Sequence, residues 1–207
     1  MIEPTPTPPA AAPAELALTR SLVLVGLMGA GKTSVGKRLA ARLGVGFVDS
    51  DAEIEAAAGM SVPEIFARLG EGAFRDGERR VISRLLTETP RVLATGGGAF
   101  IHPATRSAIA ARGRSVWIRA DLNLIWHRVR DRPGRPLLQV EDPRAALAEL
   151  DQARAPVYAL ADIVVDSRRG ASHDAMAETI VAAVRADDGA HPERSPTLAP
   201  LPRSLRP

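Results

Sequence analysis

The sequence contains no cysteine among its 207 residues. Disulfide frameworks, thiol chemistry and cysteine-based zinc sites are therefore excluded. No apolar run approaches the roughly 20 residues that a membrane-spanning helix needs. The amino terminus also lacks the basic start and apolar segment of a secretory signal. We therefore expect a soluble, cytoplasmic protein that has no membrane partner.

Aromatic residues are scarce, at 3% of the chain, so Leu, Val, Ile and Ala must fill the interior. The formal net charge is only +3, and no Lys/Arg-rich run has interleaved aromatics, which argues against a nucleic-acid partner. The length and the 45% hydrophobic content suit one globular domain. Because the ends are Pro-rich and polar, we predict disordered tails at 1–18 and 188–207 and a single domain at 19–187.

What the chain does have is a phosphate-binding pattern. Residues 26–33 read GLMGAGKT and fit G-x-x-x-x-G-K-[ST]. The apolar run at 21–25 predicts a buried strand before the loop, and Val35, Leu39 and Leu43 predict a helix after it. In this setting the loop backbone and the helix start cradle phosphate oxygens. The predicted ATP-binding residues of the loop are Gly29, Ala30, Gly31, Lys32, Thr33 and Ser34.

Two residues of this loop carry specific chemistry. Lys32 is placed to reach the β- and γ-phosphates, and the Thr33 hydroxyl to ligate Mg²⁺. The lysines of the chain are Lys32 and Lys37 alone, whereas arginine is abundant. A lysine kept in the loop of such a chain indicates a need for a compact ammonium group, while Lys37 is expected on a solvated helix surface.

Further apolar runs at 45–48, 91–94, 115–118 and 163–165 alternate with helical patterns, which predicts an α/β fold with a parallel sheet. The helical block at about 51–88 lies between the second and third strands and is a natural lid over an acceptor site. The predicted helices cover 34–43, 52–58, 61–69, 74–86, 103–111, 122–130, 143–153 and 172–185.

Polar groups follow two of these strands. Asp49 and Asp51 come directly after the second strand, where side chains face the ligand crevice of an α/β sheet. Asp51 is equally well placed to cap the next helix, and both interpretations stay open. Thr95 replaces the usual acidic Mg²⁺ contact after the third strand, so Asp49 is the nearest acidic candidate. Three glycines at 96–98 allow backbone N–H groups to approach a ligand.

Three charged features remain ambiguous from the residues alone. Arg75 and Glu78 share a helix face and form either a solvated ion pair or part of a site. The segment at 130–136 is charged and rich in Pro and Gly, which suits a lid over ATP as well as a solvated loop. His102 is expected to cap a helix or lie at the surface. Metal-ligand spacing is missing for all histidines, namely His102, His127, His173 and His191.

The ordered motifs GLMGAGKTSVGK, DSD, IFARLGEGAFRDGE, ATGGGA, RPGRPLL and ARAPVY resemble those of shikimate kinases over 19–187. The resemblance implies a three-layer α/β P-loop kinase fold of the nucleoside-monophosphate-kinase type. Its five-stranded parallel sheet would have the order 2-3-1-4-5 with helices on both faces, an acceptor-binding insertion at about 51–88 and an ATP lid at about 130–142. The implied activity is phosphorylation of the 3-hydroxyl of shikimate with ATP and Mg²⁺, in the pathway to chorismate and aromatic amino acids. We expect a monomer whose partners are ATP and shikimate.

The resemblance also implies roles at the matched positions. On the acceptor side, Asp51 contacts the acceptor hydroxyl and serves as base, and Arg75 and Arg154 hold the shikimate carboxylate. Glu78 orients Arg75 and the ring hydroxyls, and the ring is approached by Gly96, Gly97 and Gly98. Two arginines exceed what ATP requires, which independently favours an anionic acceptor.

On the nucleotide side, the resemblance places Asp49 near Mg²⁺ through water, beside Thr33. Arg135 is the lid arginine that acts with Lys32 on the transferring phosphoryl group. Arg128 stacks on adenine, and the loop at 167–170, with Arg169, forms the other side of the adenine pocket.

Two other functions compete with this one. Another small-molecule P-loop kinase, acting on gluconate or a nucleotide, is disfavoured by the GGG turn and the RPLL motif. A non-catalytic, shikimate-binding regulator is disfavoured because every expected catalytic residue is present and the tails are too short to hold a DNA-binding segment.

Overall fold

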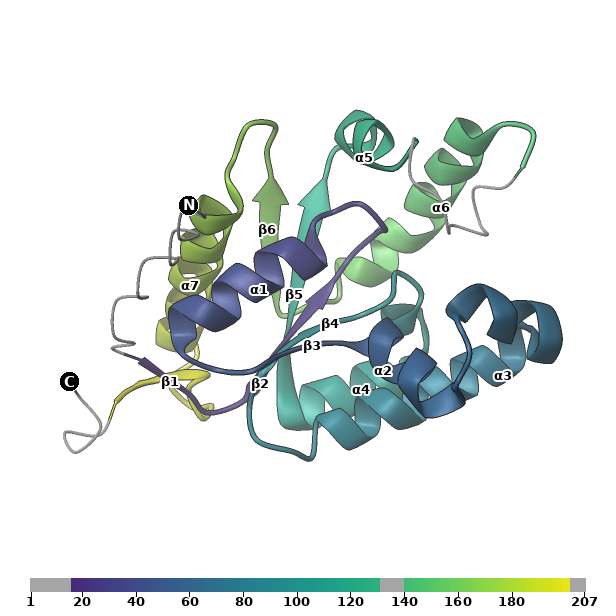
Figure 1. The fold of residues 1–207 in the computed structure, drawn as a ribbon. Helices are drawn as coiled ribbons and strands as arrows, with labels where there is room; N and C mark the ends of the chain where they lie inside the picture. Colours follow the sequence, from purple (N-terminus) through teal and green to yellow (C-terminus); the bar gives the residue numbers. More distant parts are fainter. Residues whose placement is uncertain (1–15, 131–139, 202–207) are drawn as a thin grey trace, which may run out of the picture.

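The computed structural model describes residues 16–130 and 140–201. A five-stranded parallel sheet forms its centre (Figure 1). The strands lie in the order β3-β4-β2-β5-β6. Counted along the chain within this sheet, the order is 2-3-1-4-5, so the predicted fold class is confirmed. The strands are β2 (Ser21–Val25), β3 (Phe47–Asp49), β4 (Val92–Ala94), β5 (Gly113–Ala120) and β6 (Ile163–Ser167).

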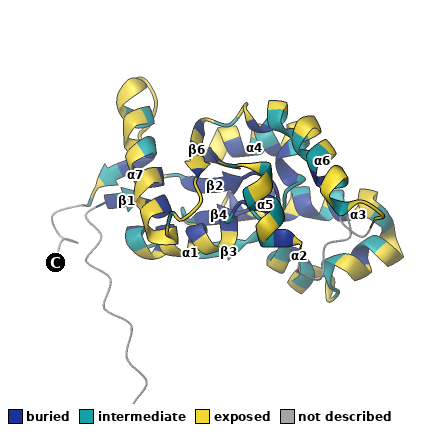
Figure 2. Cartoon of the chain, turned by 90° about the horizontal axis from the view of Figure 1, so that it is seen from above, coloured by how far each residue is buried: buried dark blue, intermediate teal, exposed yellow. Residues whose placement is uncertain are grey.

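Helices cover both faces of the sheet. The first face packs against α1 (Lys32–Leu43) and α7 (His173–Ala190), and the second against α3 (Val62–Leu85), α4 (Pro103–Arg112) and α6 (Pro143–Tyr158). All residues of β2 are buried, which explains why this central strand reads as a continuous apolar run. Figure 2 shows the buried strands between helices whose outer surfaces are exposed. Among the described residues, no helix combines the length and apolarity that crossing a membrane requires.

The shorter elements lie near the carboxyl ends of the strands. The insertion predicted at about 51–88 consists of α2 (Ser50–Ala58) and α3. A 3₁₀ turn, η1 (Ala99–Ile101), follows β4, and α5 (Leu122–Val129) follows β5. These segments therefore border the edge at which the sequence predicts a ligand crevice.

Two details of the insertion differ from the prediction. The break expected after Leu69 is a kink within α3, where Gly70 has φ 81° and ψ 169°. The idea that Asp51 caps the next helix is wrong, because α2 already begins at Ser50. Asp49 is the cap instead, and its Oδ1 accepts the N–H of Asp51 at 3.1 Å. The Asp51 side chain is thereby left for another contact.

Helix α6 continues to Tyr158, past its predicted end at Ala153. Pro156 lies inside the helix, although a proline there removes a backbone hydrogen bond. Burial of the apolar face compensates, since Leu147 is 0% and Tyr158 1% exposed. The consequence is that Arg154 lies within the helix, one turn before Tyr158.

The chain ends also correct the prediction. β1 (Leu16–Leu18) pairs antiparallel with β7 (Leu198–Pro200), and α7 runs to Ala190 rather than 185. Leu16, Leu18 and Leu198 are buried against the cluster that includes α1 and α7. The predictions of disorder at 16–18 and 188–201 are therefore wrong, while 1–15 and 202–207 lie outside the described residues. We call 16–18 together with 188–200 the terminal clasp.

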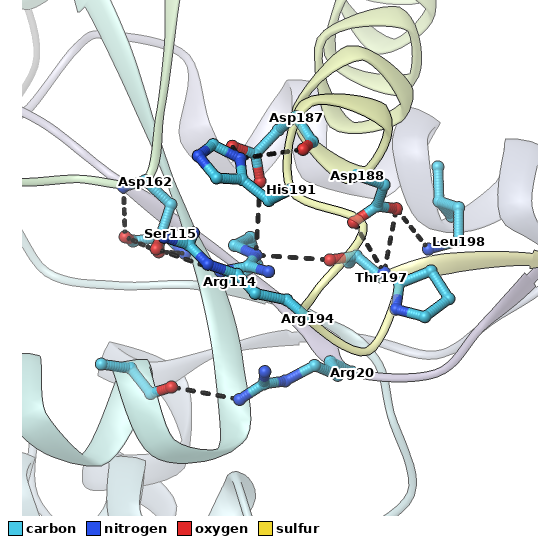
Figure 3. A network of polar contacts seen from close by, with 12 residues as sticks. Arg20, Arg114, Ser115, Asp162, Asp187, Asp188, His191, Arg194, Thr197 and Leu198 are labelled. Carbon is cyan, nitrogen blue, oxygen red and sulfur yellow. Dashed lines mark hydrogen bonds and ion pairs between the residues drawn. The ribbon is translucent and has the colours of Figure 1, made fainter.

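A polar network fixes the clasp (Figure 3). The carboxylate of Asp188 accepts the backbone N–H of Thr197 at 2.9 Å and that of Leu198 at 3.0 Å. Arg114 of β5 is 5% exposed, pairs with Asp187 at 3.6 Å and donates to Oγ1 of Thr197 at 3.4 Å. Because buried polar groups are stable only when paired, these contacts join the carboxyl-terminal segment to the central sheet.

Candidate active site

The phosphate loop joins β2 to α1, as predicted. Gly26, Gly29 and Gly31 have φ angles of 131°, 79° and 105°, in the region that favours glycine. A Cβ atom at Gly26 would lie 2.8 Å from the carbonyl oxygen of Ile118. Gly31 is the left-handed N-cap of α1. The loop backbone therefore wraps around the positive end of this helix, which is the geometry of an anion site.

A cavity of about 340 Å³ opens over the loop. It contains most of the predicted loop residues together with Asp49, Asp51 and two residues of the glycine triplet. Ala30 is the one predicted loop residue of 29–34 that does not line the cavity, and it is buried. The lining residues are Met28, Gly29, Gly31, Lys32, Thr33, Ser34, Asp49, Asp51, Thr95, Gly96, Gly97, Arg128 and His173. His173 was not singled out in the sequence, because a lone histidine at a helix start carries no motif.

Lys32 is 8% exposed and lies over its own loop. Its Nζ donates hydrogen bonds of 2.8 Å to the carbonyl oxygens of Gly26 and Leu27. The ammonium group is thus held at the floor of the cavity, where phosphate oxygens can replace or add to these acceptors.

Thr33 and Asp49 meet at the neighbouring wall. The Thr33 hydroxyl donates to Oδ2 of Asp49 at 2.8 Å. One hydroxyl and one carboxylate suit Mg²⁺, which takes oxygen ligands and keeps positions for water and phosphate. The described residues contain no cluster of three or more His, Cys, Asp or Glu side chains that could hold a metal alone. The donor set therefore fits a magnesium ion that arrives with a nucleotide.

Asp51 points its carboxyl group into the same cavity. Its Oδ1 is buried and has no hydrogen-bond partner among the described residues. Burial, followed by the negative charge of Asp49, raises the pKa of Asp51 from 3.8 to about 6, although Lys32 opposes the shift. A carboxyl group with a pKa this close to neutrality is well matched to accept a proton from a hydroxyl.

Arg75, which is partly exposed, pairs with the buried Glu78 on α3. Nη1 of Arg75 donates to Oε2 of Glu78 at 2.8 Å, and Glu78 is 2% exposed. Burial raises the pKa of Glu78, while the charge of Arg75 acts in the opposite direction. Arg75 also donates to Glu71 from Nε and Nη2, at 3.2 and 3.1 Å. The sequence analysis missed Glu71, although its spacing of four residues from Arg75 was a usable signal.

Each glycine of the triplet faces a different charged side chain. A Cβ atom at Gly96 would lie 2.7 Å from Oδ1 of Asp51, and one at Gly98 would lie 2.5 Å from Nη1 of Arg75. At Gly97 the corresponding distance to Nη1 of Arg154 is 3.6 Å. The absence of side chains at 96–98 therefore lets the charged groups converge from α2, α3 and α6.

Tyr158 is a second residue that the sequence analysis missed. Its hydroxyl donates a hydrogen bond to the carbonyl oxygen of Gly97, and its ring packs on Trp117 with centroids 5.8 Å apart. The motif ARAPVY contains both Arg154 and Tyr158, but the helix was expected to end before them. The continued helix is what brings both residues to the glycine triplet.

Arg128 reaches the loop predicted to form the other side of the adenine pocket, because its Nη1 donates to Oγ of Ser167 at 3.4 Å. Nη1 of Arg128 donates to the carbonyl oxygens of Gly29 and Ala30 at 3.2 Å, and burial lowers the pKa of Arg128. Arg169 lines a different cavity, of about 880 Å³, between the ends of β5 and β6 and the helices α5 and α6. It does not line the cavity over the phosphate loop. Arg135 and most of the predicted lid lie outside the described residues.

A phosphate loop at the carboxyl edge of a parallel sheet of order 2-3-1-4-5, with Arg75 and Arg154 at the neighbouring glycine triplet, defines a P-loop kinase of small molecules. The model of the shikimate kinase family matches residues 28–185. The chain therefore belongs to the shikimate kinase family.

Individual relatives agree with this assignment. A shikimate kinase of Paramagnetospirillum magneticum is 64% identical over 148 residues, which cover 72% of this chain and 76% of the relative. One from Ruegeria pomeroyi is 55% identical over 168 residues, covering 81% and 86%. Both matches span more than two thirds of each chain.

Solved structures also share the fold. A shikimate kinase from Acinetobacter baumannii in complex with shikimate has a TM-score of 0.78 and 38% identity, covering 81% of this chain and 94% of that chain. A gluconokinase from Sinorhizobium meliloti has a TM-score of 0.51 and 16% identity, covering 86% of this chain and 99% of that chain, which shows a common fold alone.

Proposed function

We propose that this chain transfers the γ-phosphoryl group of ATP to the 3-hydroxyl of shikimate, with Mg²⁺, in the pathway to chorismate and aromatic amino acids. The observation that carries the proposal is the convergence of Arg75 and Arg154 on the glycine triplet beside the phosphate loop. A phosphate loop needs neither arginine, so the pair indicates an acceptor with its own negative charge. The named relatives and the shikimate complex of the Acinetobacter protein support the choice of acceptor.

On the acceptor side, Arg75 and Arg154 bind the carboxylate, for which a guanidinium is suited by its planar fork of donors. Glu78 holds Arg75 in place through the 2.8 Å hydrogen bond, and its buried Oε1, which has no partner in the described part of the chain, is free for a ring hydroxyl. Asp51 accepts the proton of the attacking hydroxyl through its unpartnered Oδ1. Gly96, Gly97 and Gly98 leave room for the ring at this point.

On the nucleotide side, the backbone of residues 29–34 and the ammonium group of Lys32 bind the phosphates. Thr33 and Asp49 would hold Mg²⁺, which neutralises phosphate charge when it is bound. Arg128, held against the loop carbonyls, is the proposed adenine contact, with Arg169 further away. Arg135 remains a prediction from the family resemblance for the transferring phosphoryl group.

Phosphoryl transfer depends on positioning and charge neutralisation more than on covalent chemistry. The cations of this site lie both at the phosphate loop, where Lys32 is held, and at the glycine triplet, beside Arg75 and Arg154. All the candidate residues in the described ranges belong to one chain, so we also propose that a monomer is sufficient for catalysis. We further propose that the protein acts in the cytoplasm.

A coupled ADP-release assay tests the acceptor. The expected result is ATP- and Mg²⁺-dependent turnover with shikimate, with kcat/KM at least about a hundredfold above that for gluconate or a nucleoside monophosphate. A higher kcat/KM with gluconate or a nucleoside monophosphate than with shikimate would show that shikimate is not the preferred acceptor. Tight shikimate binding without ADP release would favour the non-catalytic regulator. Light scattering of the same preparation measures the oligomeric state.

A further inference from the structure

The buried hydroxyl of Tyr158 has no role in the function proposed above. Tyr158 is the single tyrosine of the chain and is 1% exposed. A phenylalanine would fill the same space against Trp117. A buried hydroxyl is unfavourable unless it is hydrogen-bonded, so the partners of this group indicate what it does.

Those partners belong to the candidate acceptor site. The hydroxyl donates to the carbonyl oxygen of Gly97, in the middle of the triplet. Arg154 is four residues before Tyr158 on α6, so the two side chains share a face of the helix. Nη1 of Arg154 lies against Gly97, at 3.6 Å from the position of a Cβ atom there. Tyr158, Gly97 and Arg154 therefore form one contact group.

The electrostatics of the hydroxyl are consistent with a fixed donor. Burial raises its pKa to about 12, while the charge of Arg154 acts in the opposite direction. The hydroxyl therefore keeps its proton throughout the neutral range. It donates to the carbonyl oxygen of Gly97, the residue against which the guanidinium group of Arg154 lies.

We propose that Tyr158 is a positioning residue of the acceptor site, whose hydroxyl fixes Arg154 relative to the Gly97 peptide so that the guanidinium is oriented before the acceptor carboxylate binds. This inference rests on the proposed function. Without the hydroxyl, Arg154 would sample more orientations. Binding of the carboxylate would then have to order the Arg154 side chain, and this cost would weaken the net affinity for the acceptor. The phosphate loop does not contact Tyr158 through any hydrogen bond described here, so ATP binding should be unaffected.

Steady-state kinetics of Tyr158→Phe test the role. We expect the KM for shikimate to rise about three- to tenfold, as for one lost hydrogen bond, with the KM for ATP within twofold. The matched control is Leu147→Val, which loosens the buried face of the same helix but removes no hydrogen bond. It should lower the melting temperature and leave the KM for shikimate unchanged. Equal KM changes in the two variants would reduce Tyr158 to a packing residue.

An analogue with the carboxylate reduced to an alcohol makes the test specific. The parent should strongly prefer shikimate, and Tyr158→Phe should show a smaller preference. When Tyr158→Phe is added to Arg154→Ala, the preference for shikimate over the alcohol analogue should change little, because the guanidinium group that Tyr158 orients is already absent. An unchanged preference in Tyr158→Phe, or additive effects in the double variant, overturns the positioning role.

A second measurement keeps the hydroxyl of Tyr158 in place. Because the chain has one tyrosine, biosynthetic 3-fluorotyrosine labels position 158 alone. Its fluorine resonance should shift on saturation with shikimate and shift less with the alcohol analogue. The same shift with both ligands overturns the proposal. Absence of shikimate turnover in the parent overturns the proposed function as well, whereas turnover with an unaffected Tyr158→Phe overturns the positioning role alone.

Discussion

Asp51 and Glu78 direct two buried oxygens, Oδ1 and Oε1, at the same backbone position, and neither oxygen has a hydrogen-bond partner within 16–130 or 140–201. A Cβ atom at Gly96 would lie 2.7 Å from the first and 2.9 Å from the second. The carboxyl groups come from α2 and α3, and glycine at 96 is what lets them approach the end of β4 together. Steric exclusion at Gly96 therefore tests the geometry of the acceptor site without removing any charge.

Gly96→Ala should lower kcat/KM for shikimate about 10- to 100-fold, because the methyl group must displace both carboxyl groups. The KM for ATP should stay within twofold. Gly46→Ala is the control, since nothing lies within 4 Å of a Cβ atom there. Steady-state kinetics of both variants test this prediction. Turnover near that of the parent in Gly96→Ala would show that acceptor binding does not depend on the approach of Asp51 and Glu78 to Gly96.

Asp51→Asn should abolish turnover and increase stability at neutral pH. The folded-state pKa of about 6 exceeds the ordinary value of 3.8, so the ionised carboxylate is disfavoured by folding. The unfolded chain binds fewer protons between these values, and stability therefore falls as pH rises through that window. About two pKa units correspond to an upper limit of about 3 kcal/mol at pH 7.5.

Thermal unfolding of the parent and Asp51→Asn at pH 7.5 and pH 4.5 measures this effect. The advantage of the variant should shrink at the lower pH, where Asp51 carries a proton in the folded protein. A variant that is less stable than the parent at pH 7.5 would contradict the raised pKa. In the parent, kcat/KM should fall as pH drops below about 6, since the base becomes protonated.

The two lysines of the chain provide a matched pair. Lys32→Ala should reduce kcat by 10²-fold or more, because its ammonium group is held at the phosphate loop where charge develops in the transition state. Lys37→Ala, on the exposed face of the same helix, should leave kcat within about twofold. If both variants retained near-normal turnover, the loop would have no part in the reaction.

The sequence predicts the parts of the site that follow general rules. Asp49, Asp51 and the glycines at 96–98 were placed together because parallel strands end at one edge. Tyr158 was missed because Pro156 suggests a helix end, whereas burial of Tyr158 extends α6 through it. Local propensity is a weak guide where tertiary packing contributes more.

The terminal clasp could not be predicted for a different reason. Each of its strands has only three residues, too few for a periodic apolar pattern, and each lies next to a Pro-rich segment. Leu18 pairs with Leu198, near the opposite end of the chain, so no local pattern reports the pairing. Only the folded domain brings the two segments together, with Arg114 and Asp188 as partners for their polar groups.

Asp188→Ala tests whether the clasp contributes to stability. The substitution leaves the backbone N–H groups of Thr197 and Leu198 without their acceptor, and Thr197 is 0% exposed. A buried donor without a partner costs about 1 to 3 kcal/mol, or a fall in melting temperature of roughly 3 to 10 °C for a chain of this size. The KM values for shikimate and ATP should not change, because the clasp is far along the sheet from the phosphate loop (Figure 1).

The control for this prediction is Glu178→Ala on the same helix. Glu178 pairs with Arg42 at 2.6 Å, but both side chains are exposed, and such pairs contribute less than about 1 kcal/mol. Equal melting temperatures for the two variants would mean that the terminal clasp does not contribute to the stability of the domain. A larger fall in Asp188→Ala, with unchanged kinetics, would extend the cooperative folding unit to residue 200, beyond the 28–185 that the family model covers.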